Sequence, residues 1–265
     1  SYCKLGRVWP LPEKLLRDFA ASVETLYVVE ELDDFLESAL RGMGIPCAGK
    51  ALFTRVGEYT PSLIAEKILG ARAPERIEAP AVPVRPPVLC PGCPHRGLFY
   101  VLHKMKLTVS GDIGCYTLGS AAPLSAMDTT LDMGASISML HGRNVVRPDE
   151  SDRAVAVIGD STFMHSGMTG LVNAVYNHSA STVIIADNSI TGMTGHQDNP
   201  TTGKTLKGDI TAAVNLEALV RALGVQRVRV CDPYDVEELE RVLREELAAR
   251  EPSVVISRRP CALLK

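Results

Sequence analysis

The sequence predicts an α/β protein with a doubly wound parallel sheet, and three observations support this class. Short apolar runs rich in β-branched residues alternate with amphipathic helical patterns over residues 97–257. Such alternation is typical of parallel strands joined by right-handed helical crossovers. The strand candidates are apolar at nearly every position, as expected of a sheet that helices cover on both faces.

Residues 1–70 carry a separate pattern of helix, strand and helix. We expect helices over 11–20 and 33–44, the second ending near Gly44, with a strand over 25–31 between them. One strand and a few helices cannot bury a core independently. We therefore expect residues 1–70 to be the C-terminal part of a preceding α/β domain in a longer natural chain.

A linker is expected at residues 71–88, which contain ARAPERIEAPAVPVRPP. Proline disfavours helix interiors and central strands, and it favours extended polyproline geometry. The main domain is then expected over residues 89–265.

Within the main domain the patterns place five strands and five helices in alternation. The strands are expected at 107–114, 154–160, 182–188, 225–230 and 253–257, where β-branched and other apolar residues cluster. The helices are expected at 97–105, 129–142, 168–179, 216–224 and 236–250, where apolar residues recur at helical spacing.

Composition and charge restrict the class of partner. The chain of 265 residues is 46% hydrophobic and carries a net charge of −3 without long single-sign blocks, which speaks against nucleic acid or a membrane surface as partner. No apolar run reaches the roughly 18 residues of a membrane helix, and the first residues lack the apolar core of a secretory signal. The seven cysteines suggest metal or redox chemistry in a reducing compartment. We expect a cytoplasmic protein with a small-molecule or protein partner.

Polar residues end two of the expected strands. Asp160 follows Gly159 at the end of 154–160, and Asn188 follows Asp187 at the end of 182–188. Ligands of open parallel sheets bind beyond the carboxyl ends of the strands. The sequence between the two motifs is long enough for one crossover helix, so we expect neighbouring strands to bring Asp160 and Asn188 to one point.

These residues suit a magnesium ion bound to a diphosphate. Mg²⁺ takes about six oxygens, usually one or two from protein carboxylates and the rest from phosphates and water. The Asp160 carboxylate, the Asn188 amide oxygen and a backbone carbonyl near Ile190 meet that demand. Gly159 would let backbone amides approach a phosphate, and the loop 191–195 would wrap the anion with N–H groups. Each motif taken singly also fits an ordinary polar turn. A Rossmann dinucleotide site and a P-loop nucleotide site are disfavoured, because neither a G-x-G-x-x-G nor a P-loop signature is present.

The same positions resemble the thiamine-diphosphate signature, GDG followed some two dozen residues later by Asn, with Ser161 in place of the last glycine. The segments CPGCPHRG, SGDIGCYTLG, GDSTFMHSG and NSITGMTGHQ are similar to the alpha subunits of indolepyruvate:ferredoxin oxidoreductases, and the similarity runs from about Leu11 to Lys265. By this resemblance the candidate cofactor-binding residues are Gly159, Asp160, Ser161, Asn188, Ile190, Thr191, Gly192 and His196.

The resemblance implies the diphosphate-binding domain of a 2-oxoacid:ferredoxin oxidoreductase. Such an enzyme oxidatively decarboxylates arylpyruvates to acyl-CoA with coenzyme A and passes the electrons to ferredoxin, the cofactor serving as electron sink. The resemblance further implies that the activating glutamate lies in a pyrimidine-binding domain upstream, so no catalytic residue is assigned here. A ferredoxin-like domain after the last residues, a second (beta) subunit and an oligomeric assembly are also implied.

Four cysteines resemble, in order, the ligands of a proximal 4Fe-4S cluster in related oxidoreductases. They are Cys90 and Cys93 in a C-x-x-C, Cys115 after a glycine, and Cys261 near the end. Four thiolates also suit a tetrahedral Zn²⁺, and free cysteines are often only small buried apolar residues. These three interpretations stay open. His95, His165 and His196 lie in the motifs, where a histidine can contact a phosphate or carry a proton, although loop histidines are more often solvated.

Two other functional classes fit the fold. A non-oxidative thiamine-dependent decarboxylase of the sulfopyruvate or phosphonopyruvate type needs no cluster, so iron content separates it from the oxidoreductase. A non-catalytic assembly subunit would keep the fold without the activity, because fold alone does not fix function.

Overall fold

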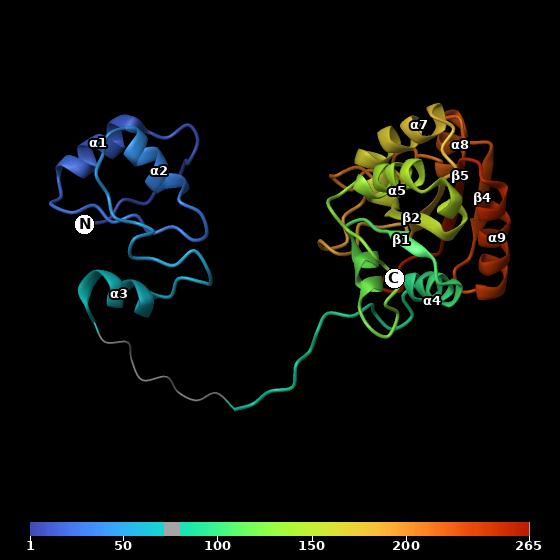
Figure 1. Ribbon diagram of the computed structural model, residues 1–265, viewed down its shortest axis with the longest axis horizontal. Coiled ribbons are helices and arrows are strands. Elements are labelled where there is room, and N and C mark those ends of the chain that lie inside the picture. The colour runs from blue at the N-terminus through green and yellow to red at the C-terminus, as the bar shows by residue number, and fades with distance from the viewer. Residues whose placement is uncertain (72–79, 265) are drawn as a thin grey trace. The chain divides into compact units, whose positions relative to one another are not determined.

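The computed structural model describes residues 1–71 and 80–264. The chain forms two compact units, Ser1–Pro83 and Val84–Lys265, and the boundary between them falls within the expected linker (Figure 1). Part of that linker, residues 72–79, lies outside the described residues. Over the described ranges, no helix is both long and apolar enough to cross a bilayer.

Among its described residues, the N-terminal unit contains three helices rather than a strand and two helices. Its helices are α1 Glu13–Ala21, α2 Phe35–Gly42 and α3 Pro61–Leu69. Its buried core contains Leu16, Val28, Leu40 and Ile45. The strand expected at 25–31 is wrong, because this segment makes only one isolated bridge, between Tyr27 and Ala48. The partner segment offers no ladder, since Pro46 has no N–H to donate and Gly49 disfavours strand geometry.

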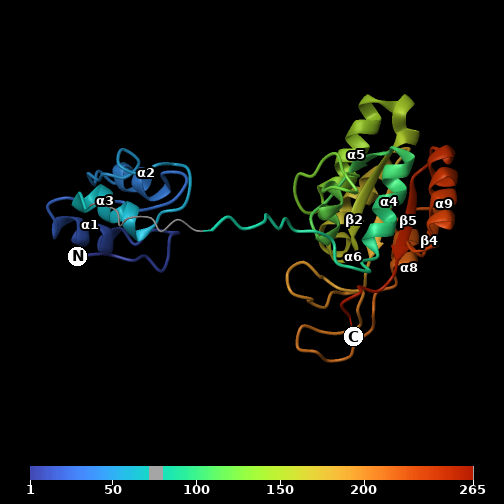
Figure 2. The same ribbon diagram turned by 90° about the horizontal axis from the view of Figure 1, so that it is seen from below.

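The C-terminal unit contains a five-stranded parallel sheet with the order β1-β2-β3-β5-β4. Figure 2 labels β2, β5 and β4 of this sheet. The strands are β1 Thr108–Ser110, β2 Ala154–Gly159, β3 Thr182–Asp187, β4 Arg227–Cys231 and β5 Ser253–Arg258. All of the strand pairs are parallel. The chain moves from β1 through β3 in one direction, then skips a position to β4 and returns to place β5 beside β3.

Helices cover both faces of this sheet. They are α4 His95–Met105, α5 Ala135–Val146, α6 Asp160–Thr162, α7 Met168–Tyr176, α8 Leu216–Ala222 and α9 Val236–Ala249, with 3₁₀ turns at Cys115–Ser120 and Pro148–Arg153 and a π-helical turn at Phe163–Gly167. The core on one face packs α4 and α9, and the core on the other packs α5, α7 and α8 (Figure 1). Strand β2 serves both, because Val155 and Val157 point to the first core and Ile158 points to the second. The predicted doubly wound parallel fold is confirmed.

One helix begins later than its apolar pattern predicts. The helix expected at 129–142 is α5, which starts at Ala135. The side chain of Asp112 fixes this start by accepting hydrogen bonds from the backbone N–H groups of Gly134 at 2.8 Å and Ser136 at 3.1 Å. Thr129 instead joins the sheet edge, where its carbonyl accepts the N–H of Gly111 at 2.7 Å.

The register of β2 and β3 prepares the site. Gly159 of β2 lies opposite Ala186 of β3, so the residues that follow them, Asp160 and Asp187, lie at the same level of the sheet. Because all five strands are parallel, their carboxyl ends lie at a single edge of the sheet.

Candidate cofactor site

Asp160 stands at the end of β2 and begins the helical stretch formed by α6, the π-helical turn and α7. Asp160 is only 2% exposed. Its Oδ2 accepts a hydrogen bond from the side-chain amide of Asn199 at 3.1 Å, and the hydroxyl of Thr201 lies at 3.4 Å. Burial raises the pKa of Asp160 to about 6, the bond from Asn199 opposes this rise, and the charge of Asp187 adds to it. A cation beside the carboxylate would favour its charged form.

Asn188 follows β3 and faces the same place. Asn188 is 6% exposed, and its side chain makes no hydrogen bond within the described part of the chain. Asp187 is already engaged, because it accepts a hydrogen bond from Arg258 at 2.7 Å and one from the N–H of Ser189 at 3.1 Å. Of these two polar residues, Asn188 is therefore the one whose side chain is available to a ligand.

A cavity of about 90 Å³, here the Asp160 cavity, lies between the ends of β2 and β3. Seven of the eight predicted cofactor-binding residues line it: Gly159, Asp160, Ser161, Asn188, Ile190, Thr191 and Gly192. His196 lines a neighbouring cavity instead, and its contact with a cofactor stays a prediction. Met193 and Thr194, from the loop expected to wrap the anion, also line the cavity, whereas sequence reasoning did not assign Ile113, Tyr116, Met133 and Thr162 to the site.

The charges around the Asp160 cavity suit a metal-bound anion. Among the described residues, no Lys or Arg lines the cavity. Burial lowers the pKa of His95 to about 4, so this lining histidine is neutral near pH 7. A diphosphate here would depend on the N-terminal end of the helical stretch at Asp160 and on a cation. The Asp160 carboxylate, the Asn188 amide and the carbonyl of Ile190 would offer hard oxygen ligands of the kind that Mg²⁺ prefers, and all three residues line the cavity.

Gly159 is required by packing as well as by any approach of a phosphate. A Cβ atom at this position would lie 2.5 Å from Cε1 of Tyr116. The Tyr116 ring is buried, and its hydroxyl donates to the carbonyl of Ile113 at 2.8 Å. Tyr116 therefore forms part of the wall of the Asp160 cavity. The sequence alone gives no signal for this role, because an aromatic residue in a turn has many possible environments.

The four predicted cysteines share a second cavity of about 100 Å³, here the cysteine cavity. Its lining includes Cys90, Cys93, Cys115 and Cys261. Burial raises the pKa of Cys93 to about 11, and the other three thiols add to the rise, which reflects their proximity. Over the described ranges, no three His, Cys, Asp or Glu side chains are close enough to hold one metal ion.

The two cavities share a wall formed by His95, Cys115, Asn188 and Gly192. A Cβ atom on Gly192 would lie 3.4 Å from the sulfur of Cys115 and 3.9 Å from Nδ2 of Asn188. A group bound among the cysteines would therefore lie next to a ligand of the Asp160 cavity.

Backbone and side-chain contacts fix the C-x-x-C turn. The N–H of Cys93 donates to the carbonyl of Cys90 at 3.1 Å, and Nε of Arg96 donates to the same carbonyl at 2.9 Å. The hydroxyl of Tyr234 donates to the carbonyl of Gly92, and the guanidinium of Arg259 stacks 3.9 Å above the Tyr234 ring. These contacts tie the turn to the segment that carries Cys261.

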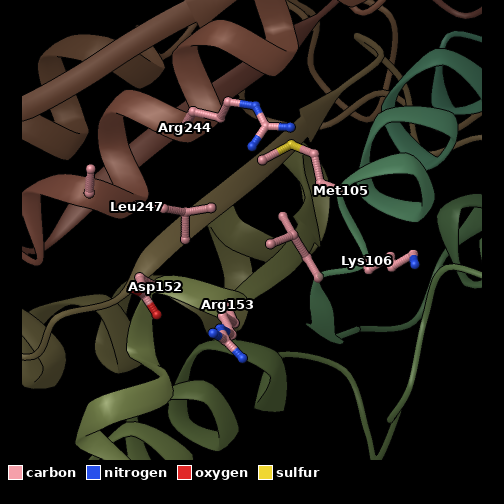
Figure 3. A pocket seen from close by; sticks show the side chains of 8 residues that line it. Met105, Lys106, Asp152, Arg153, Arg244 and Leu247 are labelled. Atoms are coloured by element: carbon pink, nitrogen blue, oxygen red, sulfur yellow. The ribbon is translucent and has the colours of Figure 1, made fainter.

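A larger cavity of about 500 Å³ lies at the opposite edge of the sheet. Figure 3 shows Met105 and Lys106 from the end of α4, Asp152 and Arg153 before β2, and Arg244 and Leu247 from α9 around it. Helices α4 and α9 both end there, and Arg244 pairs with Glu240 of its own helix at 2.6 Å. No residue singled out in the sequence lines it, so the candidate site remains at the carboxyl edge.

Comparison with known proteins gives a family match and several similar chains. Residues 112–257 match the family described as thiamine pyrophosphate enzyme, C-terminal TPP binding domain. The chain is 39% identical to the indolepyruvate oxidoreductase subunit IorA of Archaeoglobus fulgidus and 39% identical to that of Thermococcus kodakarensis. These alignments include 98% and 99% of this chain and 45% of each relative, so the chain spans slightly less than half of their length.

A solved structure shares the fold. The 2-oxoglutarate:ferredoxin oxidoreductase from Magnetococcus marinus, with 2-oxoglutarate, coenzyme A and succinyl-CoA bound, superposes with a TM-score of 0.57 at 18% identity, covering 68% of this chain and 66% of that one. The resemblance drawn from the four sequence segments is confirmed by the IorA relatives. The chain belongs to the thiamine pyrophosphate enzyme family and carries that family's C-terminal TPP-binding domain.

Proposed function

We propose that this chain binds thiamine diphosphate and Mg²⁺ in the Asp160 cavity as part of a 2-oxoacid:ferredoxin oxidoreductase that acts on arylpyruvates such as indolepyruvate. One observation carries the proposal. The buried carboxylate of Asp160 and the unengaged amide of Asn188 come from adjacent parallel strands and line one cavity that has no Lys or Arg among its described residues. A diphosphate needs a cation in such a place.

The residues divide the work of holding the cofactor. Asp160, Asn188 and the carbonyl of Ile190 would hold Mg²⁺, and the backbone around Ser161 and the loop 191–192 would face the diphosphate. When bound, thiamine diphosphate supplies the electron sink for decarboxylation. The protein positions it and, through the buried Tyr116 wall, limits the access of water.

The cysteine cavity would hold a 4Fe-4S cluster. Its four thiols line one space, which shares a wall with the Asp160 cavity. The shared wall supports the cluster over a single Zn²⁺, because Zn²⁺ has no redox chemistry and could not accept electrons from the cofactor. It also supports an electron path, because electrons leaving the cofactor would meet the acceptor next to it.

The partners follow from the same reaction. We propose a 2-oxoacid and coenzyme A as substrates, ferredoxin as electron acceptor, and a second subunit in a larger assembly, since the relatives are named as subunits. Cysteine thiolates that hold a 4Fe-4S cluster must stay reduced, so we propose the cytoplasm, a reducing compartment, as the location.

The test is a cofactor analysis of the full natural protein purified under anaerobic conditions. We expect thiamine diphosphate, iron and sulfide in one preparation, together with reduction of ferredoxin that requires both indolepyruvate and coenzyme A. Thiamine diphosphate without iron, with release of an aldehyde, would move the assignment to a non-oxidative decarboxylase. Absence of both cofactors would favour the assembly subunit.

A further inference from the structure

Asn199 returns to the site from a loop that sequence reasoning did not connect with it. The loop between β3 and α8 extends beyond the carboxyl edge of the sheet, at the same end as the C-terminus (Figure 2). Asn199 is 7% exposed, and its Nδ2 donates to Oδ2 of Asp160 at 3.1 Å. Two buried polar side chains therefore meet over 39 residues of sequence separation.

The orientation of the Asn199 amide is fixed by its own oxygen. That oxygen accepts the backbone N–H of Thr201 at 2.9 Å and the hydroxyl of Thr201 at 2.7 Å. An amide whose oxygen is held in this way must turn its NH₂ group the other way, toward Asp160. The Thr201 hydroxyl has one proton and lies closer to Asn199 than to Asp160, so Asn199 is the firmer donor to the carboxylate.

The bond from Asn199 also makes the two carboxylate oxygens of Asp160 different from each other. Both side-chain contacts of Asp160 fall on Oδ2. Oδ1 accepts no side-chain hydrogen bond from the described residues, while Asp160 lines the cavity. One oxygen is thus anchored to the loop and the other is left for a ligand.

We propose that Asn199 is a positioning residue that holds Asp160 in the orientation needed to bind Mg²⁺. The inference rests on the proposed magnesium site. Groups that orient a metal ligand from behind typically change metal affinity about 10–100-fold when they are removed. Asn199 has the position, the burial and the fixed donor that this role requires.

Ion selectivity separates positioning from mere stabilisation of the fold. Mg²⁺ demands near-ideal octahedral geometry, whereas Ca²⁺ accepts flexible coordination by six to eight oxygens. A carboxylate that has lost its anchor should therefore bind Mg²⁺ much less well and Ca²⁺ only slightly less well. A purely structural defect would weaken the binding of both ions alike.

The experiment titrates Mg²⁺ and Ca²⁺ calorimetrically into the full natural protein with saturating thiamine diphosphate. Asn199→Ala is compared with Asn215→Ala, which removes another loop asparagine, the N-cap of α8 that accepts the N–H of Ala218 at 2.9 Å without touching Asp160. We expect Asn199→Ala to raise the Kd of Mg²⁺ about 10–100-fold with a smaller change for Ca²⁺, and Asn215→Ala to leave both unchanged in the folded protein.

A second variant keeps the test decisive if Asn199→Ala does not fold. Thr201→Val removes the hydroxyl that orients the amide, and we expect a smaller loss in the same direction with the same preference for Ca²⁺. If the variants keep the wild-type Mg²⁺ affinity, or lose affinity for Mg²⁺ and Ca²⁺ equally, the inference is overturned. The proposed function then still stands, provided that the wild-type protein binds Mg²⁺ with thiamine diphosphate. Absence of Mg²⁺-dependent binding in the wild type would overturn both.

Discussion

The backbone N–H of Cys261 donates a hydrogen bond to the carbonyl of Asn188 at 2.9 Å. The side chain of Asn188 lines the Asp160 cavity, and the thiol of Cys261 lines the cysteine cavity. One peptide contact therefore joins the strand end that would hold Mg²⁺ to the segment that supplies the last cysteine. The position of each site depends on the other through this bond.

The four cavity cysteines should be required for iron, and the other cysteines should not. Replacing Cys90, Cys93, Cys115 or Cys261 by Ser removes one thiolate from the proposed cluster, so we expect iron and sulfide to fall to less than half of the wild-type content in each variant. The measurement is iron and sulfide analysis after anaerobic purification. Cys3→Ser is the control, because Cys3 lies in the N-terminal unit. Equal iron in all five variants would contradict the cluster.

Asp160 should make the stability of the metal-free protein depend on pH. Its pKa is raised from 3.8 to about 6 in the folded state, mainly by burial. The folded state then holds the proton more tightly than the unfolded state, so this contribution is present below pH 4 and is lost as the pH rises through 6. The loss is about 3 kcal/mol at most.

Urea unfolding between pH 4 and 8 checks this, with Asp160→Asn as the comparison because it cannot titrate. The difference in unfolding free energy between wild type and variant should change in favour of the variant as the pH rises. Mg²⁺ affinity should change in the opposite sense and increase over the same pH range, because the metal requires the ionised carboxylate. A difference that does not vary with pH would show that Asp160 titrates near its ordinary value.

Gly159→Ala should destabilise the fold through Tyr116. The new Cβ would lie 2.5 Å from the tyrosine ring, and overpacking of this kind costs about 1–3 kcal/mol. Gly142→Ala is the matched control, because no atom lies within 4 Å of a Cβ there and alanine is the better helix former. Urea unfolding should show a loss for the first variant and no loss for the second. Equal stability of the two variants would contradict the packing argument.

The sequence predicts the sheet, and the grouping of polar residues at one of its edges, because both follow from the patterns of individual strands. Strands β2 and β3 are continuous apolar runs, and the polar residues that end them fall at one edge once the strands are parallel neighbours. The same reasoning cannot distinguish two Gly-Asp steps. The side chain of Asp112 caps α5, whereas that of Asp160 lines a cavity, and only the tertiary contacts of the two residues distinguish these roles.

Other features depend on contacts that no local pattern encodes. The strand expected at 25–31 has suitable residues but no partner ladder within its unit. Asn199 reaches Asp160 through the fold of a long irregular loop. The gathering of four cysteines around one cavity was suggested by resemblance rather than by spacing, because Cys261 lies far from the other three in sequence.

Thiamine diphosphate binding by the full natural protein tests the central claim most directly. Calorimetric titration with and without Mg²⁺ would compare the wild type with Asp160→Ala and Asn188→Ala, and Asp198→Asn would serve as an exposed acidic control in the adjoining loop. We predict tight binding that requires Mg²⁺ in the wild type and the control, and loss of that binding in both site variants. Wild-type affinity in Asp160→Ala, or binding that is indifferent to Mg²⁺, would contradict the account.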